Sequence, residues 1–229
     1  MVSGVSALRI LAISDIHERV SLLRELSTRL RKSSQNPDLV VVAGDITYFK
    51  GVNVVISILN EINRLLCTLV LFIPGNCDPP ELLGIERVGQ DILNLHARVV
   101  EISGYVFYGI GGGGLSPFNT LIEFAEEQFE KFIDPIRGTD PSRLLLVTHQ
   151  PIYGLFDKVK SGERVGSKVF SAFLREKQPL LWITGHVHEN SGWSVIGRTT
   201  VVHPGPLMRG YYAIVELDDQ VKSVSINKL

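Results

Sequence analysis

Seven side chains that can bind metal ions follow short apolar runs of this 229-residue sequence. Five runs rich in Val, Leu and Ile each end in a turn that carries an Asp, an Asn or a His. These donors are Asp15, His17, Asp45, Asn76, His149, His186 and His188. Imidazole, carboxylate and amide donors without a thiolate suit Mn²⁺, Fe, Co²⁺, Ni²⁺ or Zn²⁺, and the sequence does not choose among these metals. The pattern predicts a metal site assembled from several strand ends.

Each of these segments alone has an ordinary explanation. An Asp at a strand end more often caps a turn, and a single His is more often a satisfied core or surface residue. Gly-Asp and Gly-Asn pairs are common turn signals. His186 and His188 are better candidates, because alternate residues of an extended segment point the same way. Four of the six histidines stand at these strand ends, and that concentration favours the metal site.

Strands and helices alternate in the first half of the chain. Three β-branched runs predict buried strands over Leu8–Ile13, Leu39–Ala43 and Leu69–Ile73. Between them, apolar residues recur with the spacing of one helix face. The first helix is indicated by Leu22, Leu26 and Leu30, and the second by Val55, Leu59, Ile62 and Leu66. This alternation is typical of a parallel or mixed sheet covered by helices.

The second half is richer in strands. Arg98–Ile102 and Tyr105–Ile110 predict a hairpin, and a helix is expected over Thr120–Phe132. Further strands are expected over Leu144–Thr148, Leu180–Thr184, Gly192–Ile196, Thr199–Val202, Tyr211–Leu217 and Val221–Ile226. Because these strands are too many for one doubly wound sheet, we expect two sheets packed face to face with helices outside. The carboxyl ends of neighbouring strands form one edge in such folds, so the seven donors are expected to meet there.

Taken in order, the donor segments resemble the motifs of the calcineurin-like metallophosphoesterase superfamily. They are Asp15-x-His17, Gly44-Asp45, Gly75-Asn76-x-Asp78, Thr148-His149 and Gly185-His186-x-His188. Pro204-Gly205-Pro206 resembles the Asn-Pro-Gly turn that often follows, with His203 in place of the Asn. The resemblance implies an α/β fold, a four-layer αββα sandwich of two mixed β-sheets flanked by helices. It also implies that residues 1–229 form a single metallophosphoesterase domain.

The same resemblance implies two divalent metal ions, with manganese among the candidates, and a role for each donor. The first metal would be held by Asp15, His17 and His188. The second metal would be held by Asn76, His149 and His186, and Asp45 would bridge both. Two cations about 3.5–4 Å apart need a bridging carboxylate and can share a hydroxide that attacks phosphorus in line. The implied activity is two-metal hydrolysis of a phosphoester bond in a small phosphorylated molecule or nucleotide.

One position departs from the family pattern. Most members read Gly-Asn-His-Asp or Gly-Asn-His-Glu, and that His, helped by the acidic residue, is thought to protonate the leaving group or stabilise the transition state. This chain reads Gly75-Asn76-Cys77-Asp78, so Cys77 and Asp78 are the candidate catalytic residues. A thiol is a weak hydrogen-bond donor, and a small filler is an equally good interpretation of Cys77. The replacement resembles a subgroup of small bacterial and archaeal phosphodiesterases, which favours diesters over monoesters.

Other functions stay open beside a phosphodiesterase. A phosphomonoesterase would use the same metal ligands. A non-catalytic metal-binding interaction scaffold of this fold, like the retromer subunit, has an eroded site, whereas all seven metal positions are filled here. A nuclease of the superfamily usually adds a capping or DNA-binding region, and this chain has no spare length for one. A protein Ser/Thr phosphatase is disfavoured, because no arginine-bearing run follows Gly44-Asp45.

Composition and charge narrow the partners and the compartment. The net charge is −1, so no broad basic excess points to nucleic acid or to an anionic membrane. The two cysteines suit a reducing compartment, and the apolar run Leu8–Ile13 is too short to span a bilayer. We therefore expect a cytoplasmic protein without a membrane partner, and homo-oligomer formation stays open. His96 is expected at the surface, and Trp182 and Trp193 are expected in the core.

Overall fold

The computed structural model describes residues 7–229, which form two six-stranded mixed sheets and a separate pair of short strands. The first sheet consists of β1 (Leu8–Ile13), β2 (Leu39–Ala43), β3 (Leu69–Ile73), β4 (Ile92–Asn94), β13 (Tyr211–Asp218) and β14 (Gln220–Lys228). Its order is β14-β13-β1-β2-β3-β4. The first four strands run parallel, and the β13–β14 hairpin adds antiparallel along β1. The carboxyl ends of β1, β2 and β3 therefore lie at one edge.

The second sheet also has a parallel centre, formed by different strands. It consists of β5 (Val99–Ile102), β6 (Tyr105–Ile110), β9 (Leu144–Thr148), β10 (Leu181–Thr184), β11 (Gly192–Ile196) and β12 (Thr199–His203). Its order is β11-β12-β10-β9-β6-β5, with parallel pairing from β12 to β6 and an antiparallel strand at each edge. The short strands β7 (Gly113–Gly114) and β8 (Glu123–Phe124) pair with each other.

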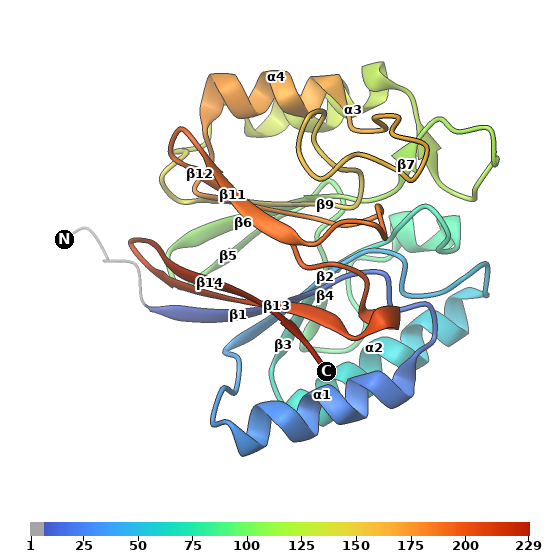
Figure 1. Cartoon of the computed structure of the whole chain (residues 1–229), viewed down its shortest axis with the longest axis vertical. Helices are drawn as coiled ribbons and strands as arrows, with labels where there is room; N and C mark the ends of the chain where they lie inside the picture. Colours follow the sequence, from blue (N-terminus) through green and yellow to red (C-terminus); the bar gives the residue numbers. More distant parts are fainter. Residues whose placement is uncertain (1–6) are drawn as a thin grey trace.

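Two helices cover the outer face of each sheet (Figure 1). The helices are α1 (Val20–Lys32), α2 (Val52–Leu66), α3 (Glu126–Ile133) and α4 (Lys168–Lys177). A central core, to which Val41 and Leu145 belong, fills the space between the sheets. Leu59 of α2 and Phe170 of α4 belong to the two outer cores. Because the central strands are buried on both faces, they read as unbroken apolar runs. The predicted four-layer αββα sandwich is thereby confirmed.

The helix predicted over Thr120–Phe132 is shorter than expected. Helix α3 begins only at Glu126, because the preceding residues form a loop and strand β8. The hydroxyls of Ser116 and Thr120 donate to the carboxylate of Glu123, and these bonds hold the loop in a non-helical path.

Strand β4 and helix α4, like the short strands β7 and β8, were not predicted from the sequence. Helix α4 had a signal, since Phe170, Phe173 and Leu174 share one helix face and are buried. Ser167 caps this helix, with its side chain accepting from the Phe170 amide. Strand β4 has only three residues, too few to show a period.

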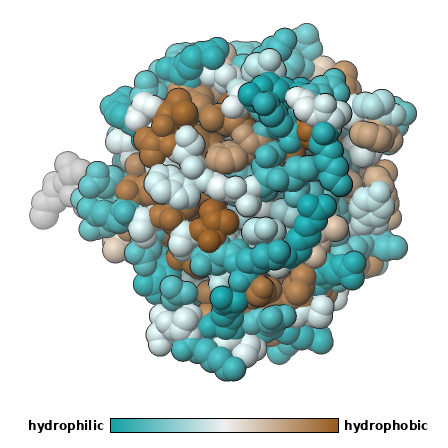
Figure 2. Space-filling model, in the orientation of Figure 1, coloured by the Kyte–Doolittle hydropathy of each residue, from teal (hydrophilic) through white to brown (hydrophobic). Residues whose placement is uncertain are grey.

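The two tryptophans differ in burial. Trp182 of β10 is fully buried as predicted, whereas Trp193 is 49% exposed on the edge strand β11. Val195 of the same strand is 54% exposed, and Figure 2 shows apolar side chains gathered on this face of the molecule. The prediction for Trp193 is wrong because an edge strand has no layer packed over it here. Among the described residues, no helix is both long and apolar enough to cross a membrane.

Candidate metal centre

The seven predicted donors lie where strands of the two sheets end. Asp15, Asp45 and Asn76 follow β1, β2 and β3, which are parallel neighbours in the first sheet. His149 and His186 follow β9 and β10, parallel neighbours in the second. Parallel pairing puts these strand ends at one edge of each sheet, and the two edges meet across the central core.

One group of donors gathers around Asp15. His188 Nε2 lies 3.1 Å from Asp15 Oδ1 and 3.3 Å from His17 Nε2. His17 Nε2 in turn lies 3.7 Å from Asp45 Oδ2. These four residues present ligand atoms that all lie within 4.8 Å of one another.

A second group gathers around His149. Its Nε2 lies 2.9 Å from Asn76 Oδ1 and 3.4 Å from Asp45 Oδ1. The His186 ring stands edge-on to the His149 ring, with 5.0 Å between the centroids. Asp45, His149 and His186 again present ligand atoms within 4.8 Å of one another, so Asp45 belongs to both groups.

The spacing of these donors fits metal coordination. Two ligands about 2.1 Å from one metal and at a right angle to each other are about 3 Å apart. The ligand atoms just described approach to between 2.9 and 3.4 Å, apart from the longer contact between His17 and Asp45. His17 Nε2 and His188 Nε2 face each other at 3.3 Å, and both can ligate one cation when each imidazole carries its proton on Nδ1. The donor set therefore fits divalent metals.

Burial and charge shift the pKa values of these groups. Burial raises the pKa of Asp15, but its hydrogen bond to His188 and the charge of His149 lower that pKa by more than burial raises it. The net result is a pKa well below the ordinary range. Burial lowers the pKa of His149, whereas the charge of Asp45 raises it, and the result is about 9. Burial and the charge of His149 lower the pKa of His186 to about 4. A cation that binds His149 must displace its proton, so binding releases protons.

The backbone is strained at four of the donors. Asp15, His17, Asp45 and His186 have φ values of 54°, 44°, 49° and 78°, in the left-handed region that side chains rarely adopt. Such conformations cost of the order of 1–3 kcal/mol each and cluster at functional sites. Four such conformations among seven donors support a functional site at this edge.

Glycine lets the two sheets approach each other at this edge. A Cβ at Gly185 would lie 2.0 Å from Ser14 Oγ and 2.8 Å from the Ala43 carbonyl oxygen, both at the first sheet. Within the first sheet, a Cβ at Gly75 would lie 2.0 Å from Asp45 Oδ1. Neither contact is sterically allowed, so glycine is required before these donors.

Several residues outside the predicted set orient the donors. His149 Nδ1 donates to the Ala43 carbonyl at 2.8 Å, which directs Nε2 toward the centre. Asp15 Oδ2 accepts from Ser14 Oγ at 2.5 Å and from the His186 amide at 3.2 Å, and Oδ1 faces His188. Arg209 donates to the His188 carbonyl at 2.8 Å. No metal-ligand signal in the sequence marks Ser14 or Arg209, because their roles depend on contacts across the fold.

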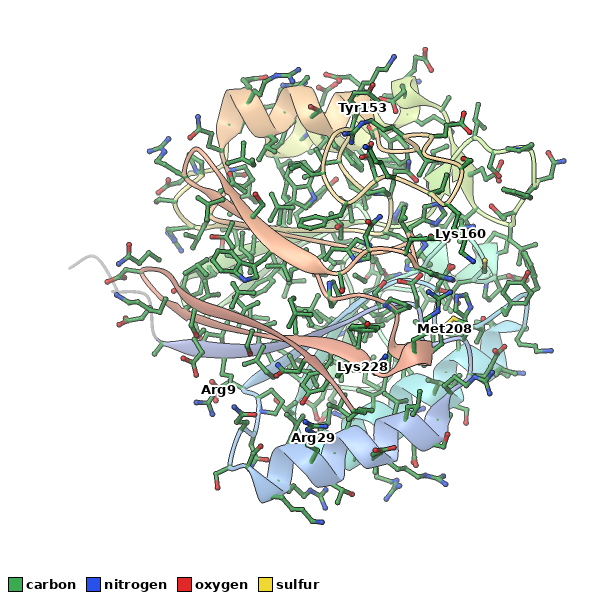
Figure 3. All side chains as sticks on the ribbon, in the orientation of Figure 1. Arg9, Arg29, Tyr153, Lys160, Met208 and Lys228 are labelled. Carbon is green, nitrogen blue, oxygen red and sulfur yellow. The ribbon has the colours of Figure 1, made fainter. Side chains whose placement is uncertain are left out.

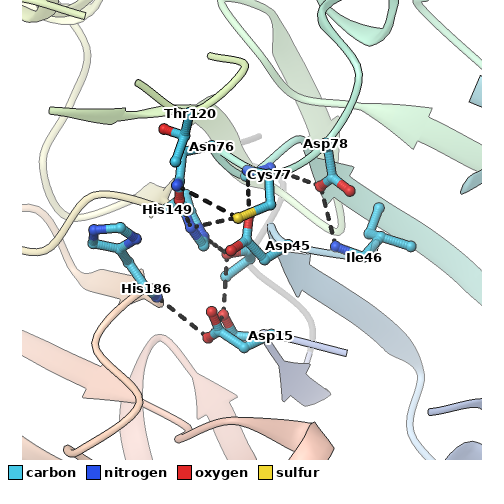
Figure 4. Close-up of polar contacts among 12 residues, drawn as sticks. Asp15, Asp45, Ile46, Asn76, Cys77, Asp78, Thr120, His149 and His186 are labelled. Carbon is cyan, nitrogen blue, oxygen red and sulfur yellow. Dashed lines mark hydrogen bonds and ion pairs between the residues drawn. The ribbon is translucent and has the colours of Figure 1, made fainter. Parts of the chain in front are cut away.

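Cys77 and Asp78 occupy different positions beside the centre (Figure 4). The Cys77 thiol is buried 3.6 Å from Asn76 Nδ2, and burial, followed by the charge of Asp45, raises its pKa far above the ordinary range. Asp78 is fully buried and accepts from the amides of Ile46, Thr47 and Gly75 and from the Thr47 hydroxyl. Burial and the charge of Asp45 raise its pKa to about 7. With its oxygens occupied by four donors, Asp78 ties the turn after β2 to the turn after β3.

The two remaining histidines are buried outside the donor set. His96 is only 6% exposed, so its predicted surface position is wrong. It packs against Phe124 and Phe132, and its Nδ1 accepts from the Gly111 amide at 3.0 Å. His203 is fully buried, and its Nδ1 accepts from the Gly205 amide within the turn that follows β12.

Two clefts open from the centre. The larger, about 690 Å³, begins at Asn76, His186 and His188. The smaller, about 640 Å³, begins at His17 and His188 and extends past Tyr48 and Met208. His188 lines both clefts, so a phosphorus atom held beside it would have space on two sides.

The chain is similar to known proteins along almost its entire length. The family model described as calcineurin-like phosphoesterase matches residues 8–190. The uncharacterized protein MJ1162 of Methanocaldococcus jannaschii is 31% identical over 230 residues, which cover 94% of this chain and 98% of that protein. Among solved structures, TT1561 of Thermus thermophilus superposes with a TM-score of 0.76 at 16% identity, covering 97% of this chain and 99% of that one. A dimetal phosphatase from Danio rerio superposes with a TM-score of 0.68 at 14% identity, covering 98% of this chain and 99% of that one. The two structural likenesses concern the fold alone.

Proposed function

The chain belongs to the calcineurin-like phosphoesterase family and is a metal-dependent phosphoesterase, and we propose that it hydrolyses phosphodiesters at two metal ions held by the seven donors. The observation that carries this proposal is the placement of Asp45. Its Oδ2 faces His17, and its Oδ1 faces His149, so one carboxylate spans both donor groups. That is the geometry expected of a bridging ligand between two cations.

The chain's own residues would prepare the centre for hydrolysis. Bound metals supply Lewis acidity at phosphoryl oxygens and lower the pKa of water. Asp15 and Asp45 balance the cationic charge. The bond from His149 Nδ1 to the Ala43 carbonyl holds that ring in its ligating orientation. We assign Asp78 a positioning role, since its four accepted hydrogen bonds leave no oxygen free for substrate.

The two clefts support a diester rather than a monoester. A phosphodiester carries two substituents on phosphorus, whereas a monoester carries one. Because both clefts reach His188, each substituent would have its own space beside the centre. Cys77 agrees with this proposal, since a weak thiol donor in place of an imidazole suits substrates whose leaving group departs without much proton assistance.

The proposal is tested with two esters of the same leaving group. Protein reconstituted with Mn²⁺, Co²⁺, Ni²⁺ or Zn²⁺ is assayed with bis(4-nitrophenyl) phosphate and with 4-nitrophenyl phosphate. We expect kcat/KM for the diester to exceed that for the monoester by about tenfold or more, which corresponds to about 1.4 kcal/mol. A preference for the monoester would identify a phosphomonoesterase. Absence of turnover with every metal would favour the non-catalytic scaffold.

A further inference from the structure

The larger cleft continues from the metal centre between two loops (Figure 3). One loop covers residues 115–120, after β7, and the other covers residues 153–167, before α4. In Figure 3, Tyr153 lies on the second loop near the top of the view, beside α4. Lys160 lies lower in the view, between the levels of Tyr153 and Met208. A substituent on a phosphorus atom at the centre would extend between these loops.

The first wall of this cleft presents apolar side chains from a loop that several hydrogen bonds fix in place. Leu115 and Phe118 are 72% and 82% exposed and line the cleft. The loop is not loosely attached, because Glu123 accepts from Ser116 Oγ at 2.6 Å and from Thr120 Oγ1 at 2.7 Å. The backbone carbonyl of the donor Asn76 accepts from the amides of residues 121 and 122. The loop that carries the exposed Phe118 ring is therefore fastened to the turn that carries the donor Asn76.

The second wall presents another ring. Tyr153 is 41% exposed, and the Arg164 guanidinium and the Lys168 amine lie 5.9 and 5.8 Å from its ring centroid. Arg164 is itself held at 2.5 Å by the buried carboxylate of Asp157. Gln150 bonds to both walls, accepting from the Gly114 amide at 2.8 Å and donating to the Val165 carbonyl. The rings thus stand on two walls that a common residue holds together.

The charged side chains that line the cleft restrict the kind of ligand that it can bind. Lys160, Arg164 and Lys168 line it together with Glu163 and Glu189, so cations exceed carboxylates by one. A long apolar chain would take the charges of Lys160 and Lys168 out of water, at a large cost. A plain sugar or alkyl group would leave the rings of Phe118 and Tyr153 in water. A ligand that is flat and aromatic on one side and polar on the other satisfies both conditions.

We propose that the larger cleft binds the nucleoside of a nucleotidyl phosphodiester, with its base against Phe118 and Tyr153 and its phosphorus at the metal centre. This inference rests on the proposed phosphodiesterase activity and names its substrate class. Stacking of a base on an aromatic side chain contributes about 1–3 kcal/mol and tolerates any base, because every base has a π-face. The second substituent on phosphorus occupies the smaller cleft, beside Tyr48 and Met208.

Two diesters with one leaving group test the proposal. They are thymidine 5′-(4-nitrophenyl phosphate) and ethyl 4-nitrophenyl phosphate, which differ only in the group that the larger cleft would receive. We expect the metal-loaded protein to prefer the thymidine ester by about tenfold or more in kcat/KM, as loss of one stacked ring would predict. Phe118→Ala and Tyr153→Ala should each lower kcat/KM for the thymidine ester several-fold more than for the ethyl ester.

Matched variants separate stacking from simple loss of surface. Phe118→Tyr and Tyr153→Phe keep the rings and should keep the preference. Trp193→Ala removes an exposed ring that lines neither cleft and should change neither rate. If the two esters react equally, or if the alanine variants lower both rates by the same factor, the nucleoside assignment is overturned while the phosphodiesterase activity stands.

A binding measurement keeps the assignment testable even without turnover. Calorimetry compares the metal-loaded protein's affinity for thymidine 5′-phosphate and for ethyl phosphate, the two products that such hydrolysis would release. A preference for thymidine 5′-phosphate that Phe118→Ala abolishes supports the cleft assignment even if neither diester is hydrolysed, and in that case the proposed activity fails alone. Equal affinity for the two phosphates overturns the cleft assignment.

Discussion

The two sheets supply the candidate metal centre with different kinds of donor. The first sheet contributes every oxygen donor, from Asp15, Asp45 and Asn76, together with the imidazole of His17. The second sheet contributes only imidazoles, those of His149, His186 and His188. The negative charge therefore lies on one sheet and most of the nitrogen donors lie on the other. Neither sheet carries a complete site, so the centre depends on how the two sheets pack.

The sheets also bond to each other at a second place, away from the predicted ligands. The segment after β4 pairs with β6, with the Ala97 amide donating to the Gly109 carbonyl at 2.8 Å and the Gly109 amide donating to the Leu95 carbonyl at 3.1 Å. His96 lies inside this junction. One junction of the sheets thus carries the candidate metal donors, and the other carries a buried histidine packed against aromatic rings.

The largest expected effect is loss of the carboxylate that spans the donors of both sheets. Asp45→Ala should lower kcat/KM by about 10³-fold or more, and His17→Ala should lower it less, because His17 would serve one metal. The two variants are compared with a phosphodiester at saturating Mn²⁺, with circular dichroism to check folding. An Asp45→Ala protein with substantial activity would contradict the bridging assignment.

The next effect comes from forcing the sheets apart at the centre. Gly185→Ala places a Cβ against Ser14 Oγ and the Ala43 carbonyl, and overpacking of this kind costs about 1–3 kcal/mol. We expect a loss of unfolding free energy near the upper end of that range, together with weaker metal binding. Urea unfolding and metal titration measure both. Gly138→Ala is the control, since an added Cβ there meets no atom within 4 Å. Equal stability of the two variants would show that the sheets do not need this close contact.

A smaller effect is expected at the other junction and depends on pH. Burial, followed by the charge of Arg98, lowers the pKa of His96 to about 4, compared with about 6.5 in an unfolded chain. Between these values the unfolded chain binds more protons, so stability falls as the pH drops through about 6.5 toward 4. This loss of stability amounts to about 2 kcal/mol at pH 5.

Urea unfolding at pH 7 and pH 5 tests this expectation for His96. Comparison with His96→Asn separates its effect from that of the histidines of the candidate metal centre, which both proteins share. The variant should lose about 2 kcal/mol less than the parent between the two pH values. Parallel losses in the two proteins would mean that His96 is protonated in the folded state.

The smallest expected effect is at Cys77. Cys77→Ala should change kcat/KM for an aryl phosphodiester by less than about threefold, because a weak acid gives a good leaving group little assistance. Cys77→His should raise turnover of alkyl monoesters and make the rate depend less on the leaving-group pKa. A series of aryl and alkyl esters measures that dependence. A shallow dependence in the parent that becomes steep in Cys77→Ala would identify the thiol as the acid.

The strands and donor positions could be predicted from the sequence because their signals are local. Leu8–Ile13, Leu39–Ala43 and Leu69–Ile73 are strands with the predicted bounds, since residues buried on both faces leave an unbroken apolar run. A donor after a turn is equally visible, so the structure brings together all seven residues named from the sequence. Their roles as metal ligands, and the single domain, stay predictions.

Other features depended on contacts between distant parts of the chain, and only the folded structure decides these. The Asn76 and His149 side chains meet across 73 positions, and those of Asp15 and His188 across 173. His96 looked like a surface residue because nothing beside it in sequence shows that β6 and α3 cover it. The sequence around Phe118 and Tyr153 does not show that their rings are exposed, because that depends on how the two loops pack beside the sheets. Donor identity is a property of single residues, whereas burial, charge balance and cleft shape arise from the packing of one sheet on the other.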